Sequence, residues 1–315
     1  MENLLDGVRF VAENSDHVKV DAKRVASFCN GLHRLDSRTW LDNRLFDMSA
    51  LNETDRLNFT LLLDSQAFCY WGSPKWTIEY GGKPYDGSWG MIVSIRRALE
   101  SGIPILSPLF WENMKKGDLR GVLKGSVEIP LFTERLGIIR ELGSVLNRRF
   151  GGDFAGLIGG EKDVLGFLDR VVAGFPSFND ASSYKGREIA FFKRAQLLAW
   201  DLHNVFMDSH GAFGNIDMLT GWADYKLPYV LRKLGILKYS EQLGRKVDHG
   251  VEIPRDSAEE VEIRANTLWA ISLITEELKG KVPDVNSAQV SCHLWYLSQD
   301  RPPHERYHLT RTVSY

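Results

Sequence analysis

One aspartate in the sequence stands in a setting that suits catalysis. Asp224 lies in the run Gly221-Trp-Ala-Asp-Tyr-Lys-Leu-Pro228, between Trp222 and Tyr225. Aromatic rings on both sides partly exclude water, and a desolvated carboxylate is suited to acid–base or electrostatic work. An Asp shortly before a Pro is equally typical of a helix N-cap. Both interpretations stay open, because a catalytic carboxylate can also lie where a helix begins.

Further charged residues in the C-terminal half are candidates for binding. Lys193 and Asp201 are eight residues apart in a helical run, which places them roughly on one helix face. Glu262 and Arg264 are two residues apart and therefore point to different sides of a helix. An ordinary explanation exists for each: Lys193 and Asp201 can belong to a solvated helix, and Arg264 to a surface ion pair.

Aromatic residues are concentrated between residues 68 and 89. Aromatics make up 11% of the chain, but seven fall in this short segment: Phe68, Tyr70, Trp71, Trp76, Tyr80, Tyr85 and Trp89. Glycine and proline interrupt the segment, so it cannot be one stripe of a regular helix. Rings on an irregular loop suit stacking on a planar heterocycle, worth on the order of 1–3 kcal/mol per base. A structural cluster at an edge of the core is the alternative. Asp64 and Glu79 favour a binding site, because a carboxylate accepts hydrogen bonds from a guanine-like N–H edge.

Composition restricts the class of protein. The chain has 315 residues, 43% hydrophobic and 25% charged, with a formal net charge of −2. These values are typical of a globular protein, and they argue against a protein that grips duplex nucleic acid, which needs a basic face. The acidic N-terminus has no long apolar run, and no stretch is long enough to span a membrane. Three widely separated cysteines fit a reducing compartment, so we expect a cytoplasmic protein without a membrane partner.

Motifs for cofactors and metals are missing from the sequence. We find no Walker A sequence, no Gly-x-Ser-x-Gly elbow and no His-Glu-x-x-His. His203 and His210 are seven residues apart, but a third metal ligand is not evident. We therefore expect neither a cofactor nor a metal site.

Helical periodicity dominates the chain. The spacing of apolar residues predicts helices over 21–35, from a Thr54 N-cap towards Phe68, and over 88–100, 131–146, 162–172, 185–207, 229–234, 257–278 and 287–297. One short hairpin is expected at 76–84. The sequence thus predicts a mainly α, two-lobed helical bundle with a short β-hairpin. We expect one domain over 1–315, with lobes meeting near 150–160, where Gly151-Gly152 and Gly159-Gly160 indicate loops.

Six runs in this order cover nearly the whole chain: Phe68-Cys-Tyr-Trp-Gly72, Ser88-Trp-Gly90, Phe175-Pro-Ser-Phe-Asn-Asp180, Lys193-Arg-Ala-Gln196, Ala223-Asp-Tyr-Lys-Leu-Pro228 and Glu262-Ile-Arg-Ala-Asn-Thr267. Each run alone is weakly specific, but the ordered set resembles the queuosine salvage proteins. The resemblance implies a helical fold related to the helical DNA glycosylases. It also implies hydrolysis of queuosine 5′-monophosphate to queuine and ribose 5-phosphate, with Asp224 as the catalytic aspartate.

Physical chemistry is consistent with that activity. Cleavage of an N-glycosidic bond builds positive charge at the sugar C1′, which a fixed carboxylate stabilises. We expect the substrate to contact Phe68, Tyr70, Trp71, Trp76, Trp89, Asp201, Trp222, Tyr225 and Glu262, and the phosphate to contact Lys193, Lys226 and Arg264. The substrate is then a small molecule, and no stable nucleic-acid complex is expected. Two other functions stay open: a non-catalytic binding protein for queuosine or modified tRNA, and a DNA base-excision glycosylase.

Overall fold

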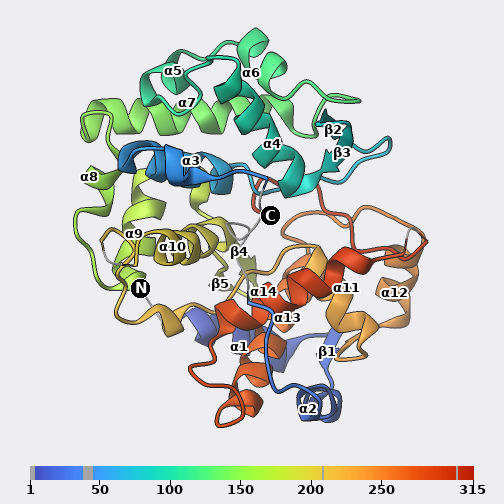
Figure 1. Cartoon of the computed structure of the whole chain (residues 1–315). Coiled ribbons are helices and arrows are strands. Elements are labelled where there is room, and N and C mark those ends of the chain that lie inside the picture. The colour runs from blue at the N-terminus through green and yellow to red at the C-terminus, as the bar shows by residue number, and fades with distance from the viewer. Residues whose placement is uncertain (1–3, 38–44, 208, 303) are drawn as a thin grey trace.

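The protein is mainly α-helical, as the sequence predicts. The computed structural model describes residues 4–37, 45–207, 209–302 and 304–315. Its helices (Figure 1) are α1 (Leu4–Asn14), α2 (Ala22–Asn30), α3 (Glu53–Ser65), α4 (Gly87–Glu100), α5 (Pro108–Asn113), α6 (Lys116–Val122), α7 (Phe132–Arg149), α8 (Phe154–Ile158), α9 (Val164–Gly174), α10 (Lys193–Val205), α11 (Lys226–Lys233), α12 (Glu241–Asp248), α13 (Ala258–Leu278) and α14 (Ser287–Leu297).

The named strands in the described ranges form three small antiparallel pairs. β2 (Thr77–Tyr80) pairs with β3 (Lys83–Asp86), β4 (Ala181–Tyr184) with β5 (Arg187–Ala190), and β1 (Val18–Val20) with the distant β6 (Leu237–Tyr239). The hairpin predicted at 76–84 is confirmed as β2 and β3. The other two pairs were not predicted from the sequence.

Several predicted helices match the structure closely, because their ends carry capping residues. Ser257 accepts a hydrogen bond from the Glu260 amide and caps α13, and Asn286 forms a capping box with Gln289 at the start of α14. Both features are N-terminal signals that the sequence displays directly. The predicted N-cap at Thr54 is wrong, because the Asn52 side chain caps α3 instead.

The single helix predicted over 185–207 is also wrong. Lys185 and Gly186 both have positive φ angles, +47° and +82°. Two successive residues of this kind form the tight turn of a β-hairpin, here between β4 and β5. The helix α10 therefore begins only at Lys193.

Helices α4 to α7 lie on one side of the molecule, and α11 to α14 lie on the other with α1 and α2 (Figure 1). Between these groups lie α3 and α10, which pack against each other. Buried apolar side chains from both groups belong to one continuous hydrophobic cluster, from Leu4 to Leu294. The long helix α13 is buried over most of its length and packs against α1, α2 and α14.

Two glycines in α7 should respond to alanine in opposite ways. A Cβ on Gly143 would lie 2.5 Å from the Pro108 carbonyl oxygen and closer still to the Glu112 amide, whereas one on Gly137 would meet nothing within 4 Å. Gly143→Ala should therefore lower the free energy of unfolding by about 1–3 kcal/mol, because α5 must move away. Gly137→Ala should raise it by about 0.5–1 kcal/mol. Urea denaturation of both variants checks the contrast; equal effects would contradict the close packing of α5 on α7.

Candidate active site

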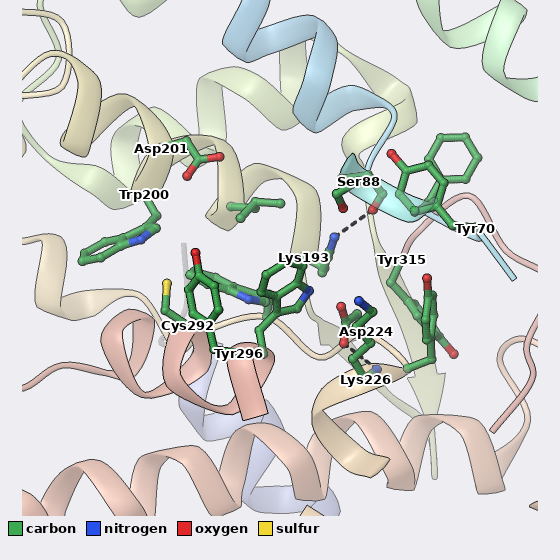
Figure 2. A pocket seen from close by; sticks show the side chains of 17 residues that line it. Tyr70, Ser88, Lys193, Trp200, Asp201, Asp224, Lys226, Cys292, Tyr296 and Tyr315 are labelled. Atoms are coloured by element: carbon green, nitrogen blue, oxygen red, sulfur yellow. Dashed lines mark hydrogen bonds between the residues drawn. The ribbon is translucent and has the colours of Figure 1, made fainter. Parts of the chain in front are cut away.

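A pocket opens between the two groups of helices. Its empty space, counted together with open solvent at its mouth, amounts to about 810 Å³. Its walls come from the segment after α3, the start of α4, α10, the loop before α11, α14 and the last described residues. The lining residues are Ala67, Phe68, Tyr70, Gly87, Ser88, Lys193, Leu197, Trp200, Asp201, Trp222, Asp224, Tyr225, Lys226, Cys292, Trp295, Tyr296 and Tyr315 (Figure 2).

Asp224 both caps a helix and lines this pocket. Its Oδ1 accepts hydrogen bonds from the amides of Lys226 (2.7 Å) and Leu227 (3.1 Å) at the start of α11. No hydrogen bond within the described part of the chain engages its Oδ2. The carboxylate is buried, with 8% of the residue exposed. The backbone amides thus fix the orientation of the side chain and leave one oxygen available to a ligand.

Lys193 lies in the middle of the pocket (Figure 2). It is buried, and its Nζ donates a hydrogen bond to the Ala67 carbonyl at 2.8 Å. Burial lowers the pKa of Lys193 to about 8, although the negative charges of Asp224 and Asp64 act in the opposite direction. The ammonium is therefore charged at neutral pH and close to losing its proton.

Lys226, two residues after Asp224, is half-buried. Its Nζ lies 4.7 Å from the centre of the Trp295 ring and donates to Gln299 Oε1 at 3.2 Å. Desolvation lowers the pKa of Lys226 to about 8, and the charge of Asp224 partly offsets that effect. Contact with an aromatic face and partial exposure leave this cation accessible to an anion entering from solvent.

The pocket includes some of the predicted aromatic residues and excludes others. Phe68, Tyr70, Trp222 and Tyr225 line it, as does the predicted Asp201. Trp71, Trp76 and Trp89 do not. The Trp76 ring is fully buried and its indole N–H binds the Leu123 carbonyl at 3.0 Å, so it is a core residue.

Trp71 and Trp89 have supporting positions instead. The Trp71 indole donates to the Thr310 carbonyl at 3.3 Å and its ring lies against Arg311. Trp89 packs edge-on against Trp295, with ring centres 5.6 Å apart. It therefore lies behind a wall residue and does not reach the ligand space.

Glu262 was expected to contact the substrate, but it does not line the pocket. Its two carboxylate oxygens accept hydrogen bonds from the amides of Asp16, His17 and Val18 and from the Tyr184 hydroxyl. These four hydrogen bonds occupy both oxygens of the Glu262 carboxylate. Glu262 therefore holds the turn between α1 and β1 in place on α13.

Arg264 was expected to bind phosphate and is likewise outside the pocket lining. Its two terminal nitrogens bind both oxygens of Asp180, at 2.8 and 2.6 Å, and its charge also faces Glu260 at 3.7 Å. The pair is almost completely buried. Burial favours a neutral Asp180, but the charge and hydrogen bonds of Arg264 outweigh this and lower the pKa of the carboxyl.

The Asp180–Arg264 pair nevertheless acts close to the site. Asp180 Oδ2 accepts a hydrogen bond from the Lys193 amide at 3.1 Å, and Arg264 Nε donates to the Ala223 carbonyl at 3.4 Å. The pair therefore connects the backbone beside Lys193 to the backbone beside Asp224.

The pocket lining also includes residues that sequence reasoning did not assign to the site. These are Trp200, Trp295, Tyr296 and Tyr315, which with Phe68, Tyr70, Trp222 and Tyr225 form the aromatic wall of the pocket, and Cys292. Trp200 and Trp295 lie on predicted helices, where an aromatic residue is usually a core residue. The aromatic character of the segment from 301 to 315 was the available signal for Tyr315.

The fold and the site define a class of mainly helical proteins that have a pocket lined by aromatic side chains and a carboxylate held in place by backbone amides. The family model described as queuosine salvage protein matches residues 48–315. The chain belongs to this family. No helix in the described ranges is both long and apolar enough to cross a membrane.

Similar proteins come from bacteria and eukaryotes. A protein of Sphaerobacter thermophilus named queuosine 5′-phosphate N-glycosylase/hydrolase is 38% identical, over 99% of this chain and 97% of its own length. Proteins with the same name from Mus musculus and Schizosaccharomyces pombe are 32% and 31% identical. The mouse match covers 98% of both chains, and the yeast match covers 95% of this chain and 92% of the relative.

Replacing the buried guanidinium by an ammonium should destabilise the protein. Arg264→Lys keeps a positive charge but loses the two parallel hydrogen bonds to Asp180, so the free energy of unfolding should fall by about 2 kcal/mol. Urea denaturation at pH 7 measures this. The control is Arg9→Lys in the exposed pair with Glu13, which should leave stability unchanged. Equal stability of Arg264→Lys and the wild type would refute the importance of the bidentate geometry.

Proposed function

We propose that this protein hydrolyses the N-glycosidic bond of queuosine 5′-phosphate and releases queuine and ribose 5-phosphate. The observation that carries the proposal is the Asp224 carboxylate in an aromatic pocket, with Oδ1 held by two amides and Oδ2 available to a ligand. Relatives that share nearly the full length of the chain bear the name of this activity.

Asp224 is assigned the catalytic role. As the bond from C1′ to the base nitrogen breaks, its electron pair leaves with the base and positive charge develops on the sugar. The fixed carboxylate stabilises that charge, and it takes a proton from the water whose oxygen forms the new bond to C1′. The departing base takes a proton from solvent to become neutral queuine, and Asp224 then releases its proton to solvent, so that one water molecule is consumed for each bond cleaved.

We assign the two lysines of the pocket to the negatively charged parts of the substrate and of the departing base. Lys226 lines the pocket and is half-buried, so a phosphate that enters from solvent can reach it. We therefore assign Lys226 to the 5′-phosphate. Lys193 is deeper, and we assign it to the negative charge that develops on the departing base. Phe68, Tyr70, Trp222 and Tyr225 supply rings that can pack on the base and sugar.

The whole chain is proposed to act as one domain. Pocket residues extend from Ala67 to Tyr315, so neither group of helices forms the site alone. The formal net charge of −2 favours a free nucleotide over intact nucleic acid as the ligand.

Removal of the Asp224 charge should abolish turnover and leave the fold intact. Asparagine can still cap α11, because its side-chain oxygen accepts the same amide hydrogen bonds. Asp224→Asn should therefore melt within a few degrees of the wild type and bind queuosine 5′-phosphate with similar affinity. Its kcat should fall by about 10³-fold or more, measured as release of queuine by chromatography.

A matched control is Asp217→Asn, at an exposed position outside the pocket, which should behave as the wild type. Normal turnover by a folded Asp224→Asn variant would exclude the proposed mechanism. Binding without product by the wild type would identify a non-catalytic binding protein.

The pH profile should reflect the two pocket lysines. Each has a pKa of about 8 and is charged below that pH, so kcat/KM for the nucleotide should fall as pH rises above about 8. If both charges are needed, log kcat/KM should approach a slope of about −2 on the alkaline side. In Lys226→Arg the guanidinium stays charged, and the slope should become about −1.

The unphosphorylated nucleoside provides the control for this profile. It lacks the group assigned to Lys226, so its wild-type slope should also be about −1. An alkaline profile that Lys226→Arg leaves unchanged would rule out Lys226 as the phosphate ligand.

A further inference from the structure

The segment from residue 307 to residue 315 binds two parts of the chain that lie far apart in sequence. After α3, the Cys69 amide donates a hydrogen bond to the Tyr315 carbonyl at 2.9 Å. Between α12 and α13, the Ile253 amide donates to the Leu309 carbonyl at 2.8 Å. Tyr315 itself lines the pocket. Both parts of the chain therefore determine where this pocket residue lies.

The hydroxyl of Tyr315 points away from the ligand space. It donates a hydrogen bond to Glu260 Oε1 at 2.9 Å, and His308 Nε2 lies 3.2 Å from it. Glu260 and His308 are both buried, and neither belongs to the pocket lining. The aromatic ring of Tyr315 is therefore the part that faces a ligand, and its hydroxyl is anchored in the interior.

His308 acts as a hydrogen-bond donor to this hydroxyl. A hydroxyl has one proton, which Tyr315 gives to Glu260, so the hydroxyl oxygen can only accept from His308. Burial lowers the pKa of His308 to about 3, and the charge of Arg264 acts in the same direction. The imidazole is therefore neutral at pH 7, with its proton on Nε2. Its buried Nδ1 has no partner within the described residues.

Arg264 connects Tyr315 to the backbone beside Asp224. Its guanidinium carbon lies 4.4 Å from the centre of the Tyr315 ring, and its Nε donates to the Ala223 carbonyl at 3.4 Å. Ala223 directly precedes Asp224, and Figure 2 shows Tyr315 and Asp224 at the same end of the pocket. A sugar placed over the Asp224 carboxylate would therefore contact the Tyr315 ring.

We propose that the Tyr315 ring holds the sugar of the substrate against Asp224, and that Glu260 and His308 are positioning residues that act through the Tyr315 hydroxyl. This inference rests on the proposed function, because it takes the reaction at C1′ as given. A displacement of about 1 Å between reacting groups can lower a rate a hundredfold. Loss of the anchored hydroxyl lets the ring shift but preserves its apolar surface, so chemistry is affected more than binding.

Tyr315→Phe tests the role of the hydroxyl, because it keeps the ring and removes only the anchor. Its kcat for queuosine 5′-phosphate should fall about tenfold, since the sugar is held less accurately over the carboxylate. Its KM should stay within about twofold of the wild-type value, since the ring remains. Release of queuine, measured by chromatography over a range of nucleotide concentrations, gives both constants.

Tyr184→Phe is the matched control. The Tyr184 hydroxyl also donates to a buried glutamate of α13, Glu262, at 2.9 Å, but neither residue lines the pocket. This variant should lower the melting temperature about as much as Tyr315→Phe and leave kcat unchanged. An equal loss of kcat in the two variants would show that lost stability alone explains the effect, and would contradict the proposal.

A double-mutant cycle tests whether His308 acts through Tyr315. His308→Leu removes the N–H donor and should lower kcat about threefold to tenfold in the wild-type background. In the Tyr315→Phe background the same change should alter kcat less than about twofold, because the hydroxyl that it serves is already gone. His308→Gln, whose side-chain amide can donate, should recover part of the loss.

The outcomes separate this inference from the proposed function. Independent effects of His308→Leu and Tyr315→Phe on kcat overturn it, as does a folded Tyr315→Phe variant with wild-type kcat. If His308→Leu does not fold, as judged by thermal melting, Tyr315→Phe and its Tyr184→Phe control decide. A wild type that does not hydrolyse queuosine 5′-phosphate refutes the proposed function itself.

Discussion

Five consecutive backbone carbonyls of the buried Ser65–Cys69 segment accept hydrogen bonds from buried cations. Arg194 binds the carbonyl of Ser65, Lys193 that of Ala67, and Arg135 those of Gln66, Phe68 and Cys69. Residues 66–69 follow the end of α3 and belong to no helix or strand, so their buried polar groups need partners from elsewhere in the chain. The same guanidiniums lie against the Phe68 ring, at 4.1 Å for Arg135 and 5.2 Å for Arg194. The aromatic wall of the pocket therefore depends on cations placed behind it.

The same cations are electrostatically unfavourable at the start of α10, and a nearby carboxylate offsets this effect. Lys193 and Arg194 are the first two residues of that helix, where the helix dipole disfavours positive charge. Asp180 supplies a carboxylate there, bound to the Lys193 amide and to Arg264. The Asp180–Arg264 ion pair lies outside the pocket lining, but its carboxylate thus offsets the unfavourable position of the two cations at the start of α10.

Local signals explain which parts of the fold could be predicted. Periodicity and caps define α13 and α14, because those signals are contained within a few residues of sequence. The turn at Lys185-Gly186 was missed, since its flanking residues continue a helical pattern and only the pairing of β4 with β5 favours the strand.

Prediction of the site was limited by a different property of the chain. Asp224 and its aromatic neighbours could be selected from their local sequence, and the family resemblance implied a role for Asp224. Sequence pattern could not distinguish Trp76, whose indole binds a core carbonyl, from Trp200, whose indole faces the pocket. Sequence pattern also could not show that Glu262 is structural, because the three amides that donate to its carboxylate are brought close only by tertiary folding. Partners distant in sequence decide whether a polar side chain is structural.

The spread of the pocket residues along the chain also has a consequence for synthesis. Ala67 and Tyr296 meet in one cavity although more than two hundred residues separate them. A growing polypeptide that has completed α3 and α10 still lacks the wall contributed by α14. The nascent chain therefore cannot form the complete pocket until α14 has left the ribosome and has docked against the earlier helices.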